Sequence, residues 1–288
     1  MTAVSDWVAG ARPRTLPAAV VPVAVGTAVA SAQGRVIWGR SALALAVSLA
    51  LQVGVNYAND YSDGVRGTDA VRVGPVRLVA SGLATPRAVK LAAVLSFAVA
   101  GVAGLVLALL TSPWLLLVGA VSIAAAWFYT GGPRPYGYAG FGELFVFVFF
   151  GLVAVVGTAY VSLGRVTGLA VVAAVPVGLL IVSLLVVNNL RDIATDGAAG
   201  KHTLAVRIGD RPTRFLYVGC LAGAFACVLA TALWRHFAVL ALVAGIAAVG
   251  PGKSVLGGAK GPHLITVLGM TGRLVLAFGA LLALGIAL

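Results

Sequence analysis

The chain alternates between long apolar stretches and short polar segments. Nine stretches are almost wholly apolar and roughly 20 residues long, the length that an α-helix needs to cross the ~30 Å hydrocarbon core of a bilayer. They cover residues 15–34, 41–58, 88–111, 113–129, 141–163, 166–189, 214–234, 237–252 and 264–287. This pattern predicts an all-α polytopic membrane protein with about nine transmembrane helices.

Composition supports this fold class. The 288 residues are 61% hydrophobic and 10% charged, and the mean hydropathy is +1.06. A water-soluble globular domain is not expected to have such a composition. Because no polar linker divides the chain, we expect one transmembrane domain over residues 1–288.

Cationic residues fall mainly on one side of the predicted helices. If the N-terminus is cytoplasmic, most of the 20 Lys and Arg residues lie in cytoplasmic segments. The positive-inside rule then predicts a multi-pass protein of the cell membrane whose polar motifs face the cytoplasm. The net charge of +12 fits loops that face anionic membrane lipid and a substrate that carries phosphate. Nucleic acid is not an expected partner.

Carboxylates are scarce and clustered. Six of the eight acidic residues lie in or between two short polar segments. These six residues are Asp60, Asp63, Asp69, Glu143, Asp192 and Asp196. Carboxylates within or near a bilayer are expensive enough that a functional role is the default interpretation.

Asparagines accompany both clusters. Asn56 and Asn59 belong to the first cluster, and Asn188 and Asn189 precede the second. Carboxylate and amide oxygens on successive helical turns suit a hard divalent cation, which most often carries a diphosphate. Polar caps at helix ends are the alternative, although a cap needs only one such residue.

The two clusters are separated by four predicted helices. The first follows the second apolar stretch, and the second follows the sixth. This spacing predicts two related four-helix halves that face each other across a central cavity, with the ninth helix as an addition.

Four segments resemble a known family. NDYSDGVRGTD (59–69) and NNLRDIATDGAAGKHTLAVRIG (188–209) resemble the aspartate-rich motifs of the UbiA-like intramembrane prenyltransferases. GARPRTLPAAVVPVAVGTA (10–28) and YTGGPRPYGYAGFGELFVFVFFG (129–151) resemble, more narrowly, the 1,4-dihydroxy-2-naphthoate polyprenyltransferases of menaquinone synthesis. The last aspartate of the first motif is Asp69, whereas the 4-hydroxybenzoate branch would place it at position 67. This departure favours the naphthoate branch.

The resemblance implies a nine-helix fold and an enzymatic reaction. The reaction is magnesium-dependent transfer of a polyprenyl group from polyprenyl diphosphate to 1,4-dihydroxy-2-naphthoate, with decarboxylation, giving demethylmenaquinone and diphosphate. The predicted Mg²⁺ ligands are Asp60, Asp63, Asp192 and Asp196, with Asp69 as a further candidate. The predicted ligands of the diphosphate and its metal are Asn56, Asn59, Asn188, Asn189, Lys201, Arg134, Arg72 and Arg77. For the four cations, an ordinary orienting charge is the alternative.

The acceptor is expected to be an electron-rich ring with a carboxylate. Arg12 and Arg14 could hold that carboxylate, or they could simply orient the membrane helix. The ring could pack against tyrosines that are otherwise typical of the membrane interface. These tyrosines are Tyr129, Tyr136 and Tyr138. Glu143 is the sole glutamate and could act as a catalytic base, as an orienting group or as a polar residue in a helix interface.

Two alternatives remain open at this point. Other UbiA-like branches prenylate 4-hydroxybenzoate, homogentisate or other acceptors. A membrane transporter would also have many helices and intramembrane charges, although the clustering of charge at one face argues against it.

Overall fold

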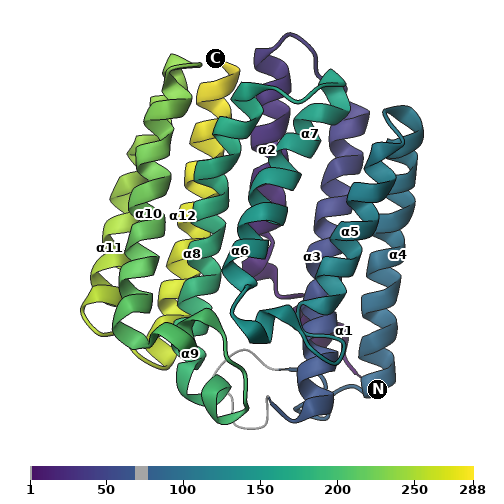
Figure 1. Ribbon diagram of the computed structural model, residues 1–288, viewed down its shortest axis with the longest axis vertical. Helices are drawn as coiled ribbons and strands as arrows, with labels where there is room; N and C mark the ends of the chain where they lie inside the picture. The colour runs from purple at the N-terminus through teal and green to yellow at the C-terminus, as the bar shows by residue number, and fades with distance from the viewer. Residues whose placement is uncertain (1, 69–76) are drawn as a thin grey trace.

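The computed structural model describes residues 2–68 and 77–288, and within these residues all regular structure is helical (Figure 1). The predicted residues Asp69 and Arg72 lie outside the described residues. The α-helices are α1 (Val4–Ala11), α2 (Pro17–Ala32), α3 (Trp38–Arg66), α4 (Pro86–Leu110), α5 (Trp114–Phe128), α6 (Gly142–Val146), α7 (Ala154–Leu163), α8 (Gly168–Ala198), α9 (Leu204–Ile208), α10 (Asp210–Ala232), α11 (Gly245–Leu256) and α12 (Pro262–Ala287). Three segments are 3-10 helices: η1 (Pro13–Thr15), η2 (Tyr136–Ala139) and η4 (His236–Ala244). One segment, η3 (Phe147–Val153), is a π-helix.

Each of the nine predicted stretches is helical. Elements α6, η3 and α7 join into one rod over Gly142–Leu163, and η4 joins α11 over His236–Leu256. Seven helices in the described part of the chain are long and apolar enough to cross a membrane, and a bent pair over 4–32 would make an eighth. Helix α5 is apolar but has only 15 residues. The all-α membrane fold is confirmed, whereas the count of nine spans is not.

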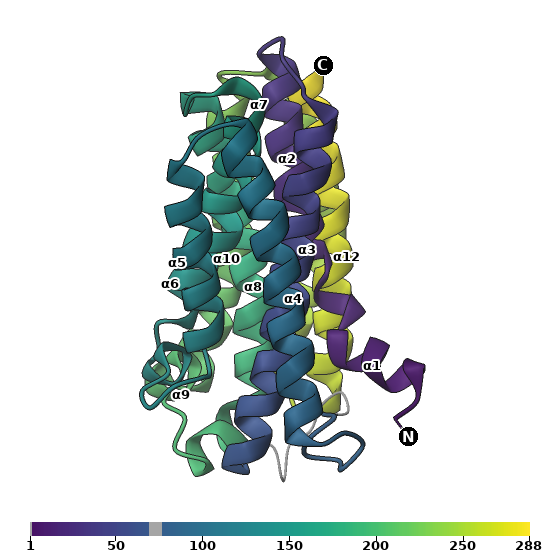
Figure 2. The same ribbon diagram turned by 90° about the vertical axis from the view of Figure 1, so that its right-hand side faces the viewer.

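The N-terminal helix is bent away from the bundle. Helix α1 projects from the side of the bundle near its lower end, and the chain turns by 52° into α2 (Figure 2). The turn is made at Arg12, whose φ of 54° is left-handed. The side-chain amide of Asn56 on α3 donates hydrogen bonds to the Ala11 carbonyl and to Thr15 Oγ1, at 2.8 and 3.1 Å. This contact fixes the bend against α3.

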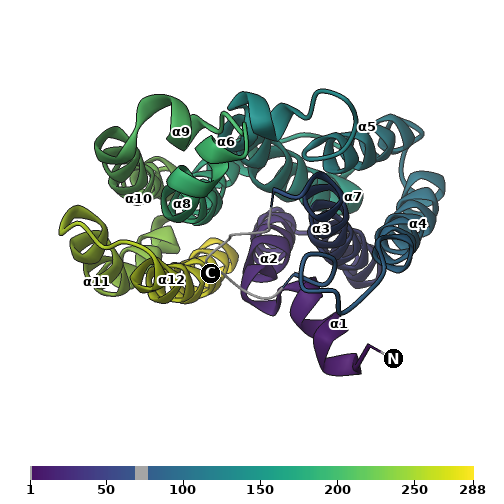
Figure 3. The same cartoon turned by 90° about the horizontal axis from the view of Figure 1, so that it is seen from below.

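Helices α2 and α8 occupy the middle of the bundle. Helix α2 packs against α7, α8 and α12, and α8 packs against α10, η3 and α12. Figure 3 shows α2–α5 grouped on one side and α10–α12 on the other. Helix α5 is held more loosely, because it packs against α3 and α4 and contributes no buried residue.

Very close helix packing fixes the rod Gly142–Leu163 against α8. A Cβ atom at Gly151 would lie 2.7 Å from the Cα atom of Gly178, so the two backbones touch where both residues are glycine. Small residues allow such approaches between membrane helices. This contact fixes the lower part of the rod beside α8. That part includes Glu143 and Phe145.

Candidate active site

A large cavity runs from the polar lower end of the bundle into its apolar interior. It has a volume of about 920 Å³ and is lined by α2, α3, α4, α5, the rod Gly142–Leu163, α8 and two residues of α12. Helices α10 and α11 do not line it, so the cavity lies mainly between the first four-helix group and α6–α8. The two predicted four-helix halves therefore contribute unequally to its walls.

Asp63, on the last turns of α3, is in contact with three side chains from other segments. It is buried, and its two carboxylate oxygens contact one hydroxyl and two cationic groups. Lys201 Nζ lies 3.0 Å from Oδ2, and the Tyr138 hydroxyl donates to Oδ1 at 2.6 Å. Arg77 Nη2 lies 3.7 Å from Oδ2. The helix then ends at Gly67, whose φ of 71° suits glycine, as its position in the sequence predicts.

The second cluster lies on the last turns of α8. Asp192 accepts two hydrogen bonds from Arg191, from Nε at 2.7 Å and from Nη2 at 2.6 Å. Arg191 also donates to Asn188 Oδ1 at 2.9 Å. Asp196, one turn further on, has Lys201 Nζ at 3.9 Å from its Oδ1.

Lys201 joins the two clusters. Its ammonium group is buried and contacts Asp63 of α3 and Asp196 of α8, residues 133 positions apart. The side chains of Asp63, Asp192, Asp196 and Lys201 all line the cavity. The prediction that the two motifs face one another is therefore matched by the geometry.

Asp60 points elsewhere. It is buried and does not line the cavity. Its Oδ2 and Oδ1 accept hydrogen bonds from the backbone N–H groups of Leu78 and Val79, at 2.8 and 3.0 Å. These bonds hold the neighbouring Arg77 beside Asp63. The assignment of Asp60 as a metal ligand stays a prediction that this placement does not support.

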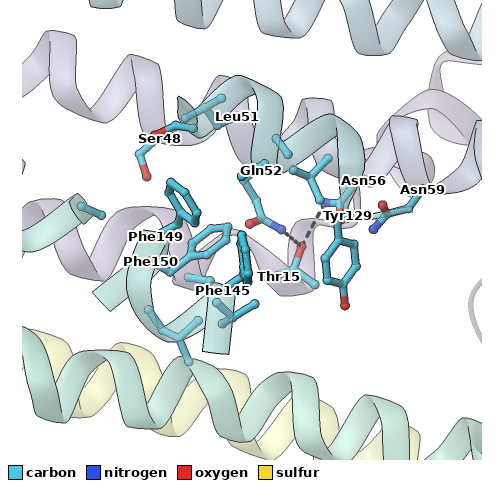
Figure 4. Close-up of a pocket in the computed structure, with 18 of the residues that line it drawn as sticks. Thr15, Ser48, Leu51, Gln52, Asn56, Asn59, Tyr129, Phe145, Phe149 and Phe150 are labelled. Carbon is cyan, nitrogen blue, oxygen red and sulfur yellow. Dashed lines mark hydrogen bonds between the residues drawn. The ribbon is translucent and has the colours of Figure 1, made fainter. Parts of the chain in front are cut away.

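The four asparagines line the cavity but differ in their partners. Asn59 Oδ1 accepts a hydrogen bond from Thr130 at 2.7 Å, and Asn56 holds the α1–α2 bend. Thr15 Oγ1 accepts from both Asn56 and Gln52, which forms a polar set part-way up the cavity wall (Figure 4). Gln52 was not singled out from the sequence. It shares a helical stripe with Asn56, Asn59 and Asp63, and that 4-3-4 spacing would have identified it.

Glu143 lies behind the cavity wall. It is buried and does not line the cavity. Asn189 Nδ2 donates to Glu143 Oε1 at 2.9 Å, and Oε2 has no hydrogen-bond partner among residues 2–68 and 77–288. Because a carboxylate oxygen accepts this bond, the Asn189 amide is held with its NH₂ group toward Glu143 and its carbonyl oxygen free for the cavity. The geometry favours the orienting role over the role of base.

The three predicted tyrosines all line the cavity. Burial raises the pKa of the Tyr138 phenol above its ordinary value, and the neighbouring Asp63 raises it further. Tyr138 therefore stays a neutral donor to Asp63. Its ring also lies beneath two cations, Lys201 at 4.9 Å and Arg66 at 5.3 Å from the centroid. Tyr136 stacks on Phe145 with centroids 4.0 Å apart.

The predicted arginines have different placements. Arg12, Arg14 and Arg77 line the cavity, whereas Arg134 is exposed and does not. Arg191, which was not singled out from the sequence, lines the cavity, and its side chain is buried with an exposure of 1%. Its position inside NNLRD, between two polar ligand-type residues, was the available signal.

The glycine-rich loop is fixed to the end of α3. The Arg66 guanidinium donates to the carbonyl oxygens of Thr130 and Gly132. A Cβ atom at Gly137 would lie 2.6 Å from the Tyr129 carbonyl oxygen, so the close backbone approach requires glycine there. The loop therefore covers the carboxylate end of the cavity and presents Tyr138 to Asp63.

The donor set suits a hard divalent cation. The cavity is lined by the carboxylates Asp63, Asp192 and Asp196 and by four Asn side chains. Oxygen ligands of this kind are those that Mg²⁺ prefers. Within the described ranges 2–68 and 77–288, no three His, Cys, Asp or Glu side chains approach closely enough to hold a metal as they stand. Cationic side chains instead neutralise the carboxylates, so the residues fit the ion by chemistry and would exchange these contacts for it.

Comparison with known proteins identifies the family of this chain. The model of the family described as "UbiA prenyltransferase family" matches residues 19–256. The chain belongs to the UbiA prenyltransferase family. This membership favours the enzyme over the transporter alternative, and it confirms the resemblance seen in the sequence motifs.

One curated relative is similar to this chain in sequence, and two solved structures are similar to it in fold. This UbiA prenyltransferase is 54% identical over 283 residues to the 1,4-dihydroxy-2-naphthoate octaprenyltransferase of Mycobacterium tuberculosis, covering 98% of this chain and 97% of that one. A UbiA homolog from Aeropyrum pernix K1 has the same fold, with a TM-score of 0.73 at 17% identity over 94% of this chain and 97% of the other. A UbiA homolog from Archaeoglobus fulgidus bound to GPP and Mg²⁺ has a TM-score of 0.67 at 15% identity, over 96% and 99%.

The contrast between Arg191 and Arg134 gives a first prediction. We expect Arg191→Gln to lower turnover by at least about 100-fold, because it removes a buried cation and leaves Asp192 without its bidentate partner. Arg134→Gln should keep turnover within about threefold, because Arg134 is exposed outside the cavity. Steady-state assays of the two purified variants measure this. Equal losses in both would show that the cavity does not define the site.

Glu143 gives a second prediction, which separates an orienting group from a base. Glu143→Gln keeps a carbonyl oxygen that can accept the Asn189 amide, so we expect at least about one-third of wild-type turnover. Glu143→Leu removes the acceptor and leaves Asn189 free to rotate, and turnover should fall about 10- to 100-fold. The pH profile of the Gln variant should match that of the wild type. A Gln variant as inactive as the Leu variant would indicate proton transfer by Glu143.

Proposed function

We propose that this protein transfers a polyprenyl group from polyprenyl diphosphate to 1,4-dihydroxy-2-naphthoate in a magnesium-dependent reaction. The products are carbon dioxide, diphosphate and demethylmenaquinone in its quinol form. The observation that carries the proposal is the Lys201 bridge between Asp63 and Asp196 at the mouth of an apolar cavity. The name of the Mycobacterium tuberculosis relative supports the choice of acceptor.

The diphosphate binds at the polar end of the cavity. Lys201, Arg77 and Arg191 supply positive charge there from three different segments, and all three are buried. Charge-assisted hydrogen bonds to phosphate are strong in such a poorly hydrated site. When bound by Asp63, Asp192 and Asp196, Mg²⁺ would neutralise the diphosphate and stabilise it as a leaving group. Lys201 and Arg191 then contact phosphate oxygens in place of the carboxylates.

The allylic end of the substrate lies among aromatic rings. Phe145, Phe149 and Phe150 line the cavity beyond the carboxylates, and Figure 4 shows them opposite Leu51 and Gln52 of α3. Breaking the allylic C–O bond leaves positive charge on carbon, and aromatic faces attract positive charge. Because the side chains around these three phenylalanines are mainly apolar, the allylic cation is also protected from attack by water or carboxylate oxygens.

The prenyl chain continues along the apolar wall. Helix α4 contributes Gly101, Gly104 and Leu105, and α5 contributes Leu115 and Leu116. The opposite wall is formed by Val153 and Gly157 of the rod. Because α5 packs only loosely on α3 and α4, a long chain can pass between α5 and the rod toward lipid.

The naphthoate ring is expected beside the α1–α2 bend. Arg12 and Arg14 line the cavity there and can pair with the carboxylate, and the set Thr15, Gln52 and Asn56 can hydrogen-bond a ring hydroxyl. The ring carbon that bears the carboxylate forms the new C–C bond to the prenyl group. The C–CO₂⁻ bond then breaks, its electron pair restores aromaticity, and carbon dioxide leaves.

The polar end of the cavity faces the cytoplasm in this proposal, with the protein in the cell membrane. Most Lys and Arg residues lie in segments at this end, which is the side that the positive-inside rule assigns to the cytoplasm. A soluble, charged naphthoate would then reach Arg12 and Arg14 directly from water.

A labelled-acceptor assay tests the proposed reaction. We expect purified protein with Mg²⁺, polyprenyl diphosphate and carboxyl-labelled 1,4-dihydroxy-2-naphthoate to release one carbon dioxide per diphosphate. Chelation of the metal should abolish both, and 4-hydroxybenzoate should be prenylated far more slowly. Efficient prenylation of 4-hydroxybenzoate, with no carbon dioxide from the naphthoate, would contradict the proposed acceptor and leave the diphosphate chemistry intact.

A further inference from the structure

A second pocket lies at the end of the bundle opposite the carboxylates. It is formed by the end of α2, the α7–α8 connection, the start of α8 and the end of α10, which meet at the upper end in Figure 1. The pocket has a volume of about 610 Å³. Its polar lining residues are Gln33, Arg165, Thr167, Trp234 and Arg235. None of these residues takes part in the reaction proposed above.

Two guanidinium groups line this pocket, and neither forms an ion pair with a carboxylate of residues 2–68 or 77–288. All acidic residues in the described part of the chain lie in α1 or toward the lower ends of the other helices. Neither Arg165 nor Arg235 makes a side-chain hydrogen bond or ion pair to residues 2–68 or 77–288. Arg40 at the same end contrasts with them, because it donates to the Val161 and Leu110 carbonyl oxygens at 2.8 and 2.6 Å. Arg40 supports the fold, whereas the other two are available to an anion.

The walls of the pocket are held in place. Gln33 Nε2 donates to Thr167 Oγ1 at 3.0 Å, which ties the end of α2 to the start of α8. A Cβ atom at Gly168 would lie 2.8 Å from the Trp234 ring, so the ring rests on the backbone of α8. Because Trp234 is held against α8, the next residue, Arg235, is also held at the pocket.

The pocket lies at the depth of lipid headgroups. Trp38 and Trp114, which begin α3 and α5, and Trp234 are exposed by 74%, 72% and 56% at this same end. Exposed tryptophans gather at the membrane–water interface. Exposed leucines and valines cover the helices below this level, as expected for surface in contact with acyl chains.

We propose that this pocket binds a phosphate group carried by an anionic phospholipid of the leaflet opposite the carboxylate cluster. The planar guanidinium forks of Arg165 and Arg235 match phosphate oxygens in bidentate geometry. Trp234 packs beside the glycerol backbone, and the acyl chains follow the apolar surface of the helices. Such a lipid joins the ends of α2, α8 and α10 by bridging two of their loops.

Lipid titration followed by native mass spectrometry tests the proposal. Full-length protein in detergent is titrated with phosphatidylglycerol, and the wild type is compared with Arg165→Gln/Arg235→Gln. We expect the double variant to bind about 30-fold more weakly, since two cation–headgroup contacts are removed. The matched control is Arg35→Gln, because Arg35 is exposed at the same end and does not line the pocket. Its affinity should stay within about threefold of the wild type.

Two further titrations identify the source of the phosphate group. Phosphatidylcholine should bind weakly and equally to the wild type and the double variant. Inorganic phosphate at the same concentrations should not raise the melting temperature of the lipid-free wild type. Stabilisation by inorganic phosphate that the double variant loses would overturn the assignment to lipid. Equal binding of phosphatidylglycerol by the wild type and the double variant, with unchanged melting temperatures, would overturn the site altogether.

Discussion

One buried ammonium group holds the polar end of the molecule together. Lys201 contacts Asp63 on α3 and Asp196 on α8, and these helices begin at distant points of the chain. Like-charged carboxylates brought together in a poorly hydrated site repel one another, so they need cations between them. The same requirement explains why Arg77 and Arg191 are buried nearby. A site whose carboxylates are neutralised by cationic side chains is also suited to exchange those contacts for metal and diphosphate.

The surrounding fold positions these charges. Asp60 uses both oxygens to hold the backbone of Leu78 and Val79, which places Arg77. Glu143 holds the Asn189 amide, and the glycine-rich loop brings Tyr138 to Asp63. Residues that resemble ligands in the sequence thus divide into those that face the cavity and those that orient them. The apolar part of the cavity needs no such support, since the burial of apolar side chains does not depend on directional contacts.

The sequence predicted the helical fold and the meeting of the two motifs, because both follow from local patterns. Apolar length identifies the helices, and the spacing of Asp192 and Asp196 places them on one face of α8. It did not separate Asp60 from Asp63, since residues three apart on a helix differ by only about 60° and tertiary contacts decide which faces the cavity. It also missed Arg191, although its position inside NNLRD was a signal, because a basic residue near a membrane helix end is also typical of an orienting charge. Arg134, exposed in the structure, is the reverse case.

The central claim is that the two motifs form one diphosphate site. A double-mutant cycle on magnesium-dependent binding of an unreactive polyprenyl diphosphate analogue tests this most directly. If Asp63 and Asp192 serve one site, Asp63→Asn and Asp192→Asn should each remove most of the binding, and the double variant should bind no more weakly than the weaker single variant. Losses in the two single variants that add in full in the double variant would mean that the motifs act independently, which would contradict this account.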